Sequence, residues 1–223
     1  MKFPASILSI FLFFLAFVSI SDALAIPQEN TNILPEEDQQ LDSGHLVKRG
    51  CVPSKPSDVC TDVPTVAFLV TKIQQHGKVG KRDSLFYSDL GGSGAIAKAS
   101  DWYKKNVPKG RGSVAFDNII NEKWYKAQAN ALGGSMAKVD QFQKRLSQAF
   151  AEASQGTVYF FTKKQNKGTD MSENLAWGGW EYPALTRNTK VKEIVQVDPN
   201  EAGDKGHVIW KQGNGHSPKA PRG

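Results

Sequence analysis

The sequence has few of the residues that build metal centres and cross-linked scaffolds. Its 223 residues include two cysteines and four histidines, and none of them shows the paired spacing of a zinc site. No Gly-x-Ser-x-Gly motif marks a nucleophilic serine, no Asn-x-Ser/Thr acceptor is present, and no internal repeat occurs. We therefore expect no metal, no cofactor, no N-glycosylation and a fold that depends on ordinary core packing.

The glycine-rich stretch DLGGSG (89–94) lacks the Lys-Ser/Thr pair that ends a phosphate-binding Walker loop. Glycines at this density are typical of a turn. The stretch therefore predicts a plain strand-to-helix connection.

The first 25 residues have the pattern of a secretory signal peptide. Lys2 precedes the apolar run ILSIFLFFLAFVSI, and the small-residue motif Ala23-Leu24-Ala25 follows it. A membrane anchor is the weaker interpretation, because the run is shorter than the ~20 residues that span a bilayer. We predict cleavage after Ala25, a secreted and extracellular protein, and no membrane span in the mature chain.

Residues 26–49 are polar, acidic and without aromatic residues, a composition that does not support a packed core. They end in Lys48-Arg49, a dibasic pair of the kind that processing proteases of the secretory pathway cleave. This pattern predicts an acidic pro-segment that is removed before Gly50. The alternative is a disordered N-terminal tail that the mature protein keeps.

The chain after residue 49 is strongly basic. Lys2, Lys48 and Arg49 are the basic residues before it, which leaves 25 basic and 16 acidic residues and a net charge of +9. Such a surface suits phosphates, nucleic acid or an anionic cell surface, although it also serves solubility. A host or cell-surface partner therefore stays a candidate, and nucleic acid is the less favoured partner.

Cys51 and Cys60 lie at the start of this mature chain. In an oxidising compartment we expect them to form a disulfide that closes a short loop. About 170 residues remain, which is enough for one domain with its own core.

Hydrophobic periodicity predicts a domain of mixed helices and strands. Short apolar or alternating runs predict strands at 65–71, 84–88, 157–162, 191–197 and 207–210. Helical spacing predicts helices from Ala95 to the stop at Pro108, over 114–132 and over 137–154. We expect an α/β (or α+β) fold over residues 50–208, a single compact domain with helices followed by a short, mostly parallel sheet. Residues 209–223 read as a basic, flexible tail.

The segment WGGWEYP (177–183) places one carboxylate, Glu181, among aromatic rings and glycines after a Lys-, Asn- and Gly-rich loop. Loops at strand ends are where α/β folds hold ligands. Aromatic faces stack on flat rings, and a carboxylate stabilises an oxocarbenium-like state. The segment thus favours a planar, cationic ring joined to a sugar. The other interpretation is a turn whose tryptophans pack the core and whose glutamate faces water.

Two stretches resemble the ADP-ribosyl cyclase / NAD glycohydrolase family over about residues 84–198. FQKRLSQAFAEA (142–153) is similar to the family's helix Phe-Trp-Lys-x-x-Ser-x-x-Phe-Ala-x-Ala, and WGGWE (177–181) is similar to its Phe-Gly-x-x-Glu motif, which carries the catalytic glutamate. Weaker matches are LFYS (85–88) and VAFDNII (114–120).

The resemblance implies a role for each matched residue, with NAD as the substrate. Glu181 would hold the ribose hydroxyls and stabilise the oxocarbenium ion as nicotinamide leaves. Ser147 would contact the pyrophosphate, Tyr87 and Trp177 would line the nicotinamide pocket, and Asp117 would lie at its rim.

The chain departs from the family at both of its pocket tryptophans. Tyr87 replaces the first, and Gln143, which is at the substrate-binding position of the second, has no ring to stack. Trp102, Trp124 and Trp180 are the candidates to supply a ring instead. With two aromatic walls reduced, hydrolysis of NAD is favoured over cyclisation.

Two other functions stay open at this point. One is a non-enzymatic secreted effector or toxin-like protein that binds through its basic face. The other is a basic secreted ribonuclease, in which Glu181, His76 or His207, and Arg187 would flank a phosphate.

Overall fold

The computed structural model describes residues 50–53, 55, 58–88, 90, 94–107, 109–163 and 176–220. The predicted signal peptide, the pro-segment and the processing residues Ala25, Lys48 and Arg49 lie outside these residues and stay predictions. Most of the glycine-rich turn and the loop before residue 176 also lie outside them. No helix in the described part of the chain is long and apolar enough to cross a bilayer.

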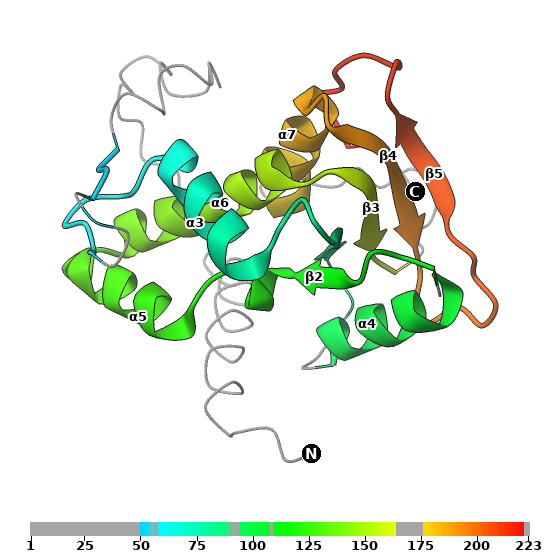
Figure 1. Ribbon diagram of the computed structural model, residues 1–223, viewed down its shortest axis with the longest axis horizontal. Helices are drawn as coiled ribbons and strands as arrows, with labels where there is room; N and C mark the ends of the chain where they lie inside the picture. The colour runs from blue at the N-terminus through cyan, green and yellow to red at the C-terminus, as the bar shows by residue number, and fades with distance from the viewer. Residues whose placement is uncertain are drawn as a thin grey trace, which may run out of the picture.

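Five strands form one sheet in the order β2-β1-β3-β4-β5. The first four are parallel to their neighbours, and β5 runs antiparallel to β4 (Figure 1). The strands are β1 (Asp83–Tyr87), β2 (Ser113–Ala115), β3 (Gly156–Phe161), β4 (Val191–Val197) and β5 (His207–Lys211).

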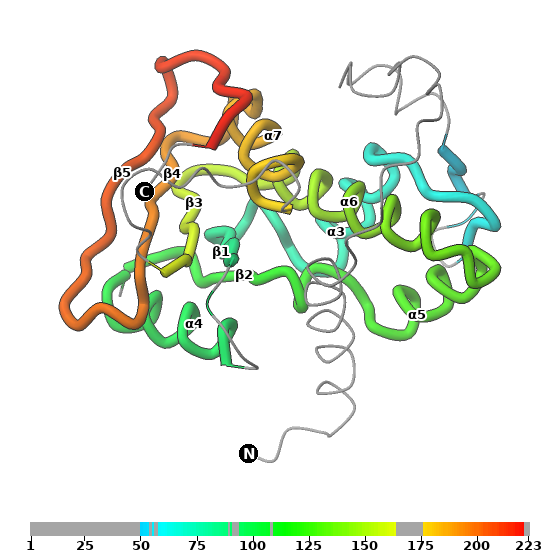
Figure 2. Tube along the Cα trace, turned by 180° about the vertical axis from the view of Figure 1, so that it is seen from behind, coloured from blue at the N-terminus to red at the C-terminus, as the bar shows by residue number. Residues whose placement is uncertain are grey.

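Helices cover both faces of this sheet. Of the helices in the described residues, α4 alone packs on one face, and the others lie on the opposite side (Figure 2). The helical segments are α3 (Val66–Gly77), α4 (Ala95–Asn106), the 3-10 turn η1 (Phe116–Asn118), α5 (Glu122–Ala131), α6 (Met136–Ala153), the π-helix η2 (Trp177–Glu181) and α7 (Tyr182–Arg187). The predicted α/β domain with a mostly parallel sheet is confirmed, with helices and strands alternating along the chain.

The chain adds strands to the two sides of the sheet in opposite directions, and the change of side lies between the parallel neighbours β1 and β3. From β1 the chain crosses through α4 to β2 on one side, whereas from β3 it crosses through η2 and α7 to β4 on the other. Ligands of open α/β sheets bind at such a switch point, outside the carboxyl ends of the strands. The carboxyl ends of β1 and β3 are therefore the place where this topology favours a site.

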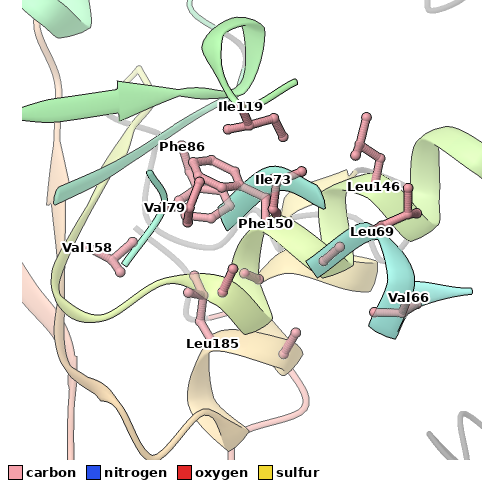
Figure 3. Close-up of a cluster of buried hydrophobic side chains, with 14 of the residues drawn as sticks. Val66, Leu69, Ile73, Val79, Phe86, Ile119, Leu146, Phe150, Val158 and Leu185 are labelled. Carbon is pink, nitrogen blue, oxygen red and sulfur yellow. The ribbon is translucent and has the colours of Figure 1, made fainter. Parts of the chain in front are cut away.

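The larger apolar layer lies between the sheet and α3, α6 and α7. Phe86 of β1 stacks on Phe150 of α6 with ring centroids 4.3 Å apart, and Leu146, one turn earlier, is fully buried (Figure 3). The apolar residues of α6 recur at the i, i+4 spacing that predicted this helix, so one stripe of the helix faces the sheet.

The predicted strand at 65–71 is wrong, because this segment begins α3. Thr65 caps the helix by accepting a hydrogen bond from the Phe68 N–H at 3.2 Å. Val66, Leu69 and Ile73 then fall on one buried stripe. A short apolar run fits a strand and a helix equally well, and here the cap and the long-range packing select the helix.

The predicted helix over 114–132 is correct only in its second half. Its first residues form β2 and η1, and α5 begins at Glu122. Asn121 marks the start of α5. Its backbone is extended, which interrupts any helix before it, and its side-chain oxygen accepts hydrogen bonds from the N–H groups of Lys123 and Trp124.

The segment predicted as a flexible tail from residue 209 instead contacts the domain. Residues 209–211 belong to β5, and the Trp210 indole N–H donates to the Gly215 carbonyl at 2.9 Å. The Thr186 hydroxyl of α7 donates to the Ser217 carbonyl at 2.9 Å, and Ala220 is buried. We name residues 212–220 the C-terminal strap, because they run from β5 back to α7 (Figure 2).

Cys51 and Cys60 form the predicted disulfide. Its loop is fastened to α5 by Gln128, whose buried amide accepts from the Cys60 N–H and donates to the Cys60 carbonyl, each at 2.8 Å. The start of the described chain is therefore bound to the helical layer.

Candidate active site

The segment WGGWE is a π-helix, where the sequence predicts a loop. The N–H of Tyr182 donates to the carbonyl of Trp177, five residues earlier, and α7 continues directly with Pro183 in its first turn. A π-helix holds one extra residue per turn, and such segments are frequent at functional sites. The wide turn packs on α6, so Glu181 is presented to that helix.

Trp177 anchors this turn in the core. Its side chain is 1% exposed and stacks on Phe160 of β3, with ring centroids 3.7 Å apart and planes 1° from parallel. Phe86 and Tyr182 each lie 5.7 Å away, centroid to centroid. Trp177 thus offers almost no surface to a ligand in this structure, and its role in lining a pocket stays a prediction.

Glu181 is buried, with 6% of its surface exposed, so the interpretation in which it faces water is wrong. Burial raises the pKa of its carboxyl to about 8, and a side-chain hydrogen bond with Ser147 of α6 opposes that rise. A carboxyl with so little solvation and a raised pKa is characteristic of functional sites more than of packed cores.

Tyr87 and Asp117 form a second polar pair nearby. The Tyr87 hydroxyl, at the end of β1, donates to Oδ1 of Asp117 in η1 at 3.1 Å. Burial raises the pKa of Asp117, and the Tyr87 hydrogen bond lowers it. The pKa of Tyr87 is raised by burial, by Asp117 and also by the charge of Glu181. The charge of Glu181 thus acts on Tyr87, which ends β1 at the carboxyl edge of the sheet, near the switch point.

Four residues that the sequence singles out thus come together from four separate segments: Tyr87, Asp117, Ser147 and Glu181. Nothing in the spacing of these positions along the chain requires this. The juxtaposition is consistent with the predicted site, while the role of each residue stays a prediction.

Gln143 lies one helical turn before Ser147 on the same face of α6. Its amide donates to the Tyr125 hydroxyl of α5 at 3.1 Å. The Tyr125 ring in turn stacks on Phe142 at 5.5 Å, and burial raises its pKa. The sequence does not single out Tyr125 as a partner of Gln143. Its only indication is that an aromatic residue lies on the helix that precedes α6.

The three tryptophans considered as replacements differ in position. Trp102 packs on the opposite face of the sheet, against Tyr159. Trp124 is engaged with the disulfide loop, donating to the Asp58 carbonyl at 3.0 Å. Trp180 is partly exposed beside α6, where the ammonium group of Lys144 lies 4.7 Å from its ring centroid. Trp180, which directly precedes Glu181 in the sequence, is therefore a tryptophan with a ring that is not fully buried in the core.

The histidines of the ribonuclease interpretation lie elsewhere. His76 is in the last turn of α3, and His207 begins β5 and is exposed. No hydrogen bond among the described residues joins either of them to Glu181, and Arg187 donates its Nε–H to the Pro183 carbonyl at 3.2 Å. No group of three metal-binding side chains occurs among the described residues either.

No protein-family model matches the chain, and no curated protein matches it. Solved ADP-ribosyl cyclases are similar to it. Their family is the one whose motifs the sequence resembles.

A cyclase variant with a glutamate replaced by alanine is 17% identical over 72% of this chain and 64% of its own, with a TM-score of 0.42. A cyclase complexed with N1-cIDPR is 16% identical over 60% and 55%, and the Aplysia cyclase with substrate NGD and product cGDPR is 16% identical over 53% and 49%, each with a TM-score of 0.36.

The matched part spans between 49% and 64% of these cyclases. Because the TM-scores and identities are low, the similarity establishes neither the activity nor the site of this chain. The fold assignment rests on the sheet and helices described above.

Proposed function

We propose that this chain is a secreted NAD glycohydrolase that breaks the nicotinamide–ribose bond, with Glu181 as the catalytic carboxylate. The observation that supports this most directly is the buried Glu181 carboxyl beside Ser147, with the Tyr87–Asp117 pair next to it. A buried carboxylate with hydroxyl neighbours suits a cationic ribosyl centre better than it suits core packing.

The proposed reaction begins with cleavage of the bond between the ribose C1′ and the nicotinamide nitrogen. The electron pair of that bond leaves with nicotinamide, which becomes neutral, and C1′ becomes an oxocarbenium-like cation. The Glu181 carboxylate stabilises this positive charge, in a site where low solvation strengthens the attraction. Water then adds to C1′ and releases a proton, which gives ADP-ribose.

The hydroxyl of Ser147 and the Tyr87–Asp117 pair would position the substrate. Ser147 interacts with the Glu181 carboxyl and opposes the rise of its pKa, so its hydroxyl is placed to orient the carboxylate and to contact the substrate phosphates or ribose. The Tyr87 ring ends β1 and is held by Asp117, which suits contact with the flat nicotinamide.

Hydrolysis is the outcome that the residues around Gln143 favour. Cyclisation needs walls that exclude water and fold the adenine back on the ribose. In this chain Gln143 presents a polar amide tied to Tyr125, in the position where the family has a ring. A polar wall leaves water close to C1′.

The decisive experiment incubates the purified protein with NAD and follows nicotinamide by chromatography. We expect release by the wild type, and a loss of about 100-fold or more in kcat/KM for Glu181→Gln, which keeps the shape and removes the charge. Glu122→Gln makes the same chemical change at an exposed position of α5 and should keep full activity.

Absence of nicotinamide release by well-folded protein over hours would overturn the proposed function. Full activity in Glu181→Gln would overturn the assignment of the site and leave the reaction standing. ADP-ribose and the cyclic product are separated in the same chromatogram, so the ratio of hydrolysis to cyclisation is measured at once.

A further inference from the structure

An open cavity of about 680 Å³ lies at the amino edge of the sheet, away from Glu181. It forms where β1, β3 and β4 begin and where α4 ends. Its volume is in the range of ~300–1,000 Å³ that small-molecule sites occupy. The proposed NAD site uses the opposite ends of the same strands, so this cavity is a separate feature.

The cavity wall contains an ion pair between Asp83 and Arg111. Asp83 accepts hydrogen bonds from Arg111 Nε at 3.0 Å and from the Tyr103 hydroxyl at 2.7 Å. Arg111 also donates to the carbonyls of Gly80 and Gln155. The charges of Asp83 and Arg111 therefore compensate each other, and both side chains join β1 to the neighbouring loops.

Three lysines of the wall have no such partner among the described residues. Lys109, Lys190 and Lys192 are exposed and line the cavity, and no hydrogen bond or ion pair of their ammonium groups occurs within the described part of the chain. They come from two distant segments that the fold brings to one rim. Glu193, the residue after Lys192, accepts a hydrogen bond from the Thr157 hydroxyl at 3.1 Å. The wall thus keeps a surplus of positive charge.

The wall also presents an aromatic hydroxyl. Tyr159 of β3 lines the cavity, and its ring packs edge-on against Tyr103. No hydrogen bond of its phenolic oxygen occurs among the described residues, which leaves that hydroxyl as a donor. A concave site with unpaired cations and a hydroxyl donor has the chemistry of anion recognition.

We propose that this cavity binds a compact polyanion that carries two or more phosphate or sulfate groups. The three ammonium groups would each contact one anionic group, and Tyr159 would donate a fourth hydrogen bond. The site is independent of NAD cleavage and stands whether or not the proposed function is correct.

Isothermal titration calorimetry with inorganic tripolyphosphate and, separately, sucrose octasulfate tests the proposal and distinguishes phosphate from sulfate. We expect saturable binding of at least one probe by the wild type. The variant Lys109→Ser/Lys190→Ser/Lys192→Ser should bind it at least about tenfold more weakly, because three charge-assisted contacts are lost. Affinity should fall as salt shortens the Debye length.

The matched control, Lys55→Ser/Lys123→Ser/Lys126→Ser, removes the same charge at exposed positions of the disulfide loop and α5 and should change affinity by less than about threefold. All six positions are exposed, so both variants should keep the wild-type circular dichroism and melting temperature.

An equal loss in both variants would mean a general charge effect and would overturn the site. No saturable binding of either probe at millimolar concentration would overturn it as well. Nicotinamide release by the cavity variant should equal that of the wild type, so the two proposals fail separately.

Discussion

At the scale of single residues, Glu181 combines a stability cost with a proposed catalytic use. Its carboxyl is buried beside Ser147, and its pKa of about 8 in the folded protein is well above the ordinary value of 4.5. The folded state therefore holds a proton that the unfolded state has released, between about pH 4.5 and pH 8. Across this window stability falls as pH rises, because the unfolded state binds fewer protons than the folded state.

Glu181→Gln should therefore stabilise the protein at high pH. An amide has no charge to bury, so we expect the free energy of unfolding to exceed that of the wild type by roughly 1–3 kcal/mol at pH 9, and by much less at pH 5. Urea unfolding at the two pH values measures this difference.

Glu122→Gln again serves as the control, since its carboxylate is exposed and pairs with Lys126 at 2.7 Å. A gain for Glu181→Gln that is equal at pH 5 and pH 9 would contradict the titration, and would point to packing instead.

The titration of the Glu181 carboxyl should also appear in the pH dependence of NAD cleavage. If the carboxylate is the form that stabilises the oxocarbenium ion, kcat/KM for NAD should rise with pH and then level off. The midpoint of the rise should lie within about one pH unit of 8. The positive nicotinamide ring of bound NAD favours the carboxylate, so the rise of kcat should lie at lower pH. A flat profile between pH 6 and pH 9 would exclude this role for Glu181.

Gln143 should control the fate of the ribosyl cation. Gln143→Trp places a ring where the cyclase family has one and removes the amide that donates to Tyr125. We expect a larger share of cyclic product relative to ADP-ribose, by roughly threefold or more. Chromatography of the products measures the ratio, and Gln148→Trp on the surface of α6, where Gln148 pairs with Glu152, is the control. An unchanged ratio would mean that the wall at Gln143 does not determine water access.

At the scale of elements, prediction succeeded where a periodic pattern was long or where β-branched residues were concentrated. Helix α6 has an apolar stripe over 18 residues, and four of the seven residues of β4 are valine or isoleucine, which favours a strand. The run at 65–71 is too short to distinguish a strand from a helix and was wrongly predicted as a strand. The π-helix was missed because its backbone register depends on Trp177 packing against Phe160, a contact between distant segments.

The N-cap hydrogen bond of Thr65 should contribute to the stability of α3. Replacing its hydroxyl in Thr65→Ala removes the cap of the Phe68 N–H and should cost about 1 kcal/mol of the free energy of unfolding. Thr71→Ala is the matched control within the same helix, because its exposed hydroxyl donates only to the Ala67 carbonyl. Chemical denaturation measures both. Equal effects would show that helix propensity, and not the cap, determines the beginning of α3.

At the scale of the whole molecule, the N-terminal disulfide loop joins the sheet's helical cover at several points. The Arg145 guanidinium of α6 is buried and donates to the carbonyls of Val63 and Pro64 at 3.0 and 3.1 Å. Gln128 holds Cys60 from α5. The loop and the residues that follow it up to Thr65 therefore connect α3, α5 and α6 into one layer.

Cys51→Ser/Cys60→Ser should lower the free energy of unfolding by about 2–3 kcal/mol, because the closed loop spans a sequence separation of nine residues. Urea unfolding of the variant and of the oxidised wild type measures the loss. We expect the variant to agree with the wild type in reducing agent and NAD cleavage to persist, since the loop lies away from Glu181. A loss of activity that exceeds the loss of folded protein would show that the loop also shapes the site.

The sequence by itself determined the class of the fold, the long helices and most of the strands, because burial imposes periods of 3.6 and 2 on residues that are neighbours in the chain. It also singled out Glu181, Ser147, Tyr87 and Asp117. Only the tertiary structure decided that these four residues lie together, that Trp177 is a core residue, and that Gln143 is paired with Tyr125. Each of these depends on contacts between segments that are far apart in sequence. The switch point between β1 and β3 is determined by strand order, which local patterns do not encode.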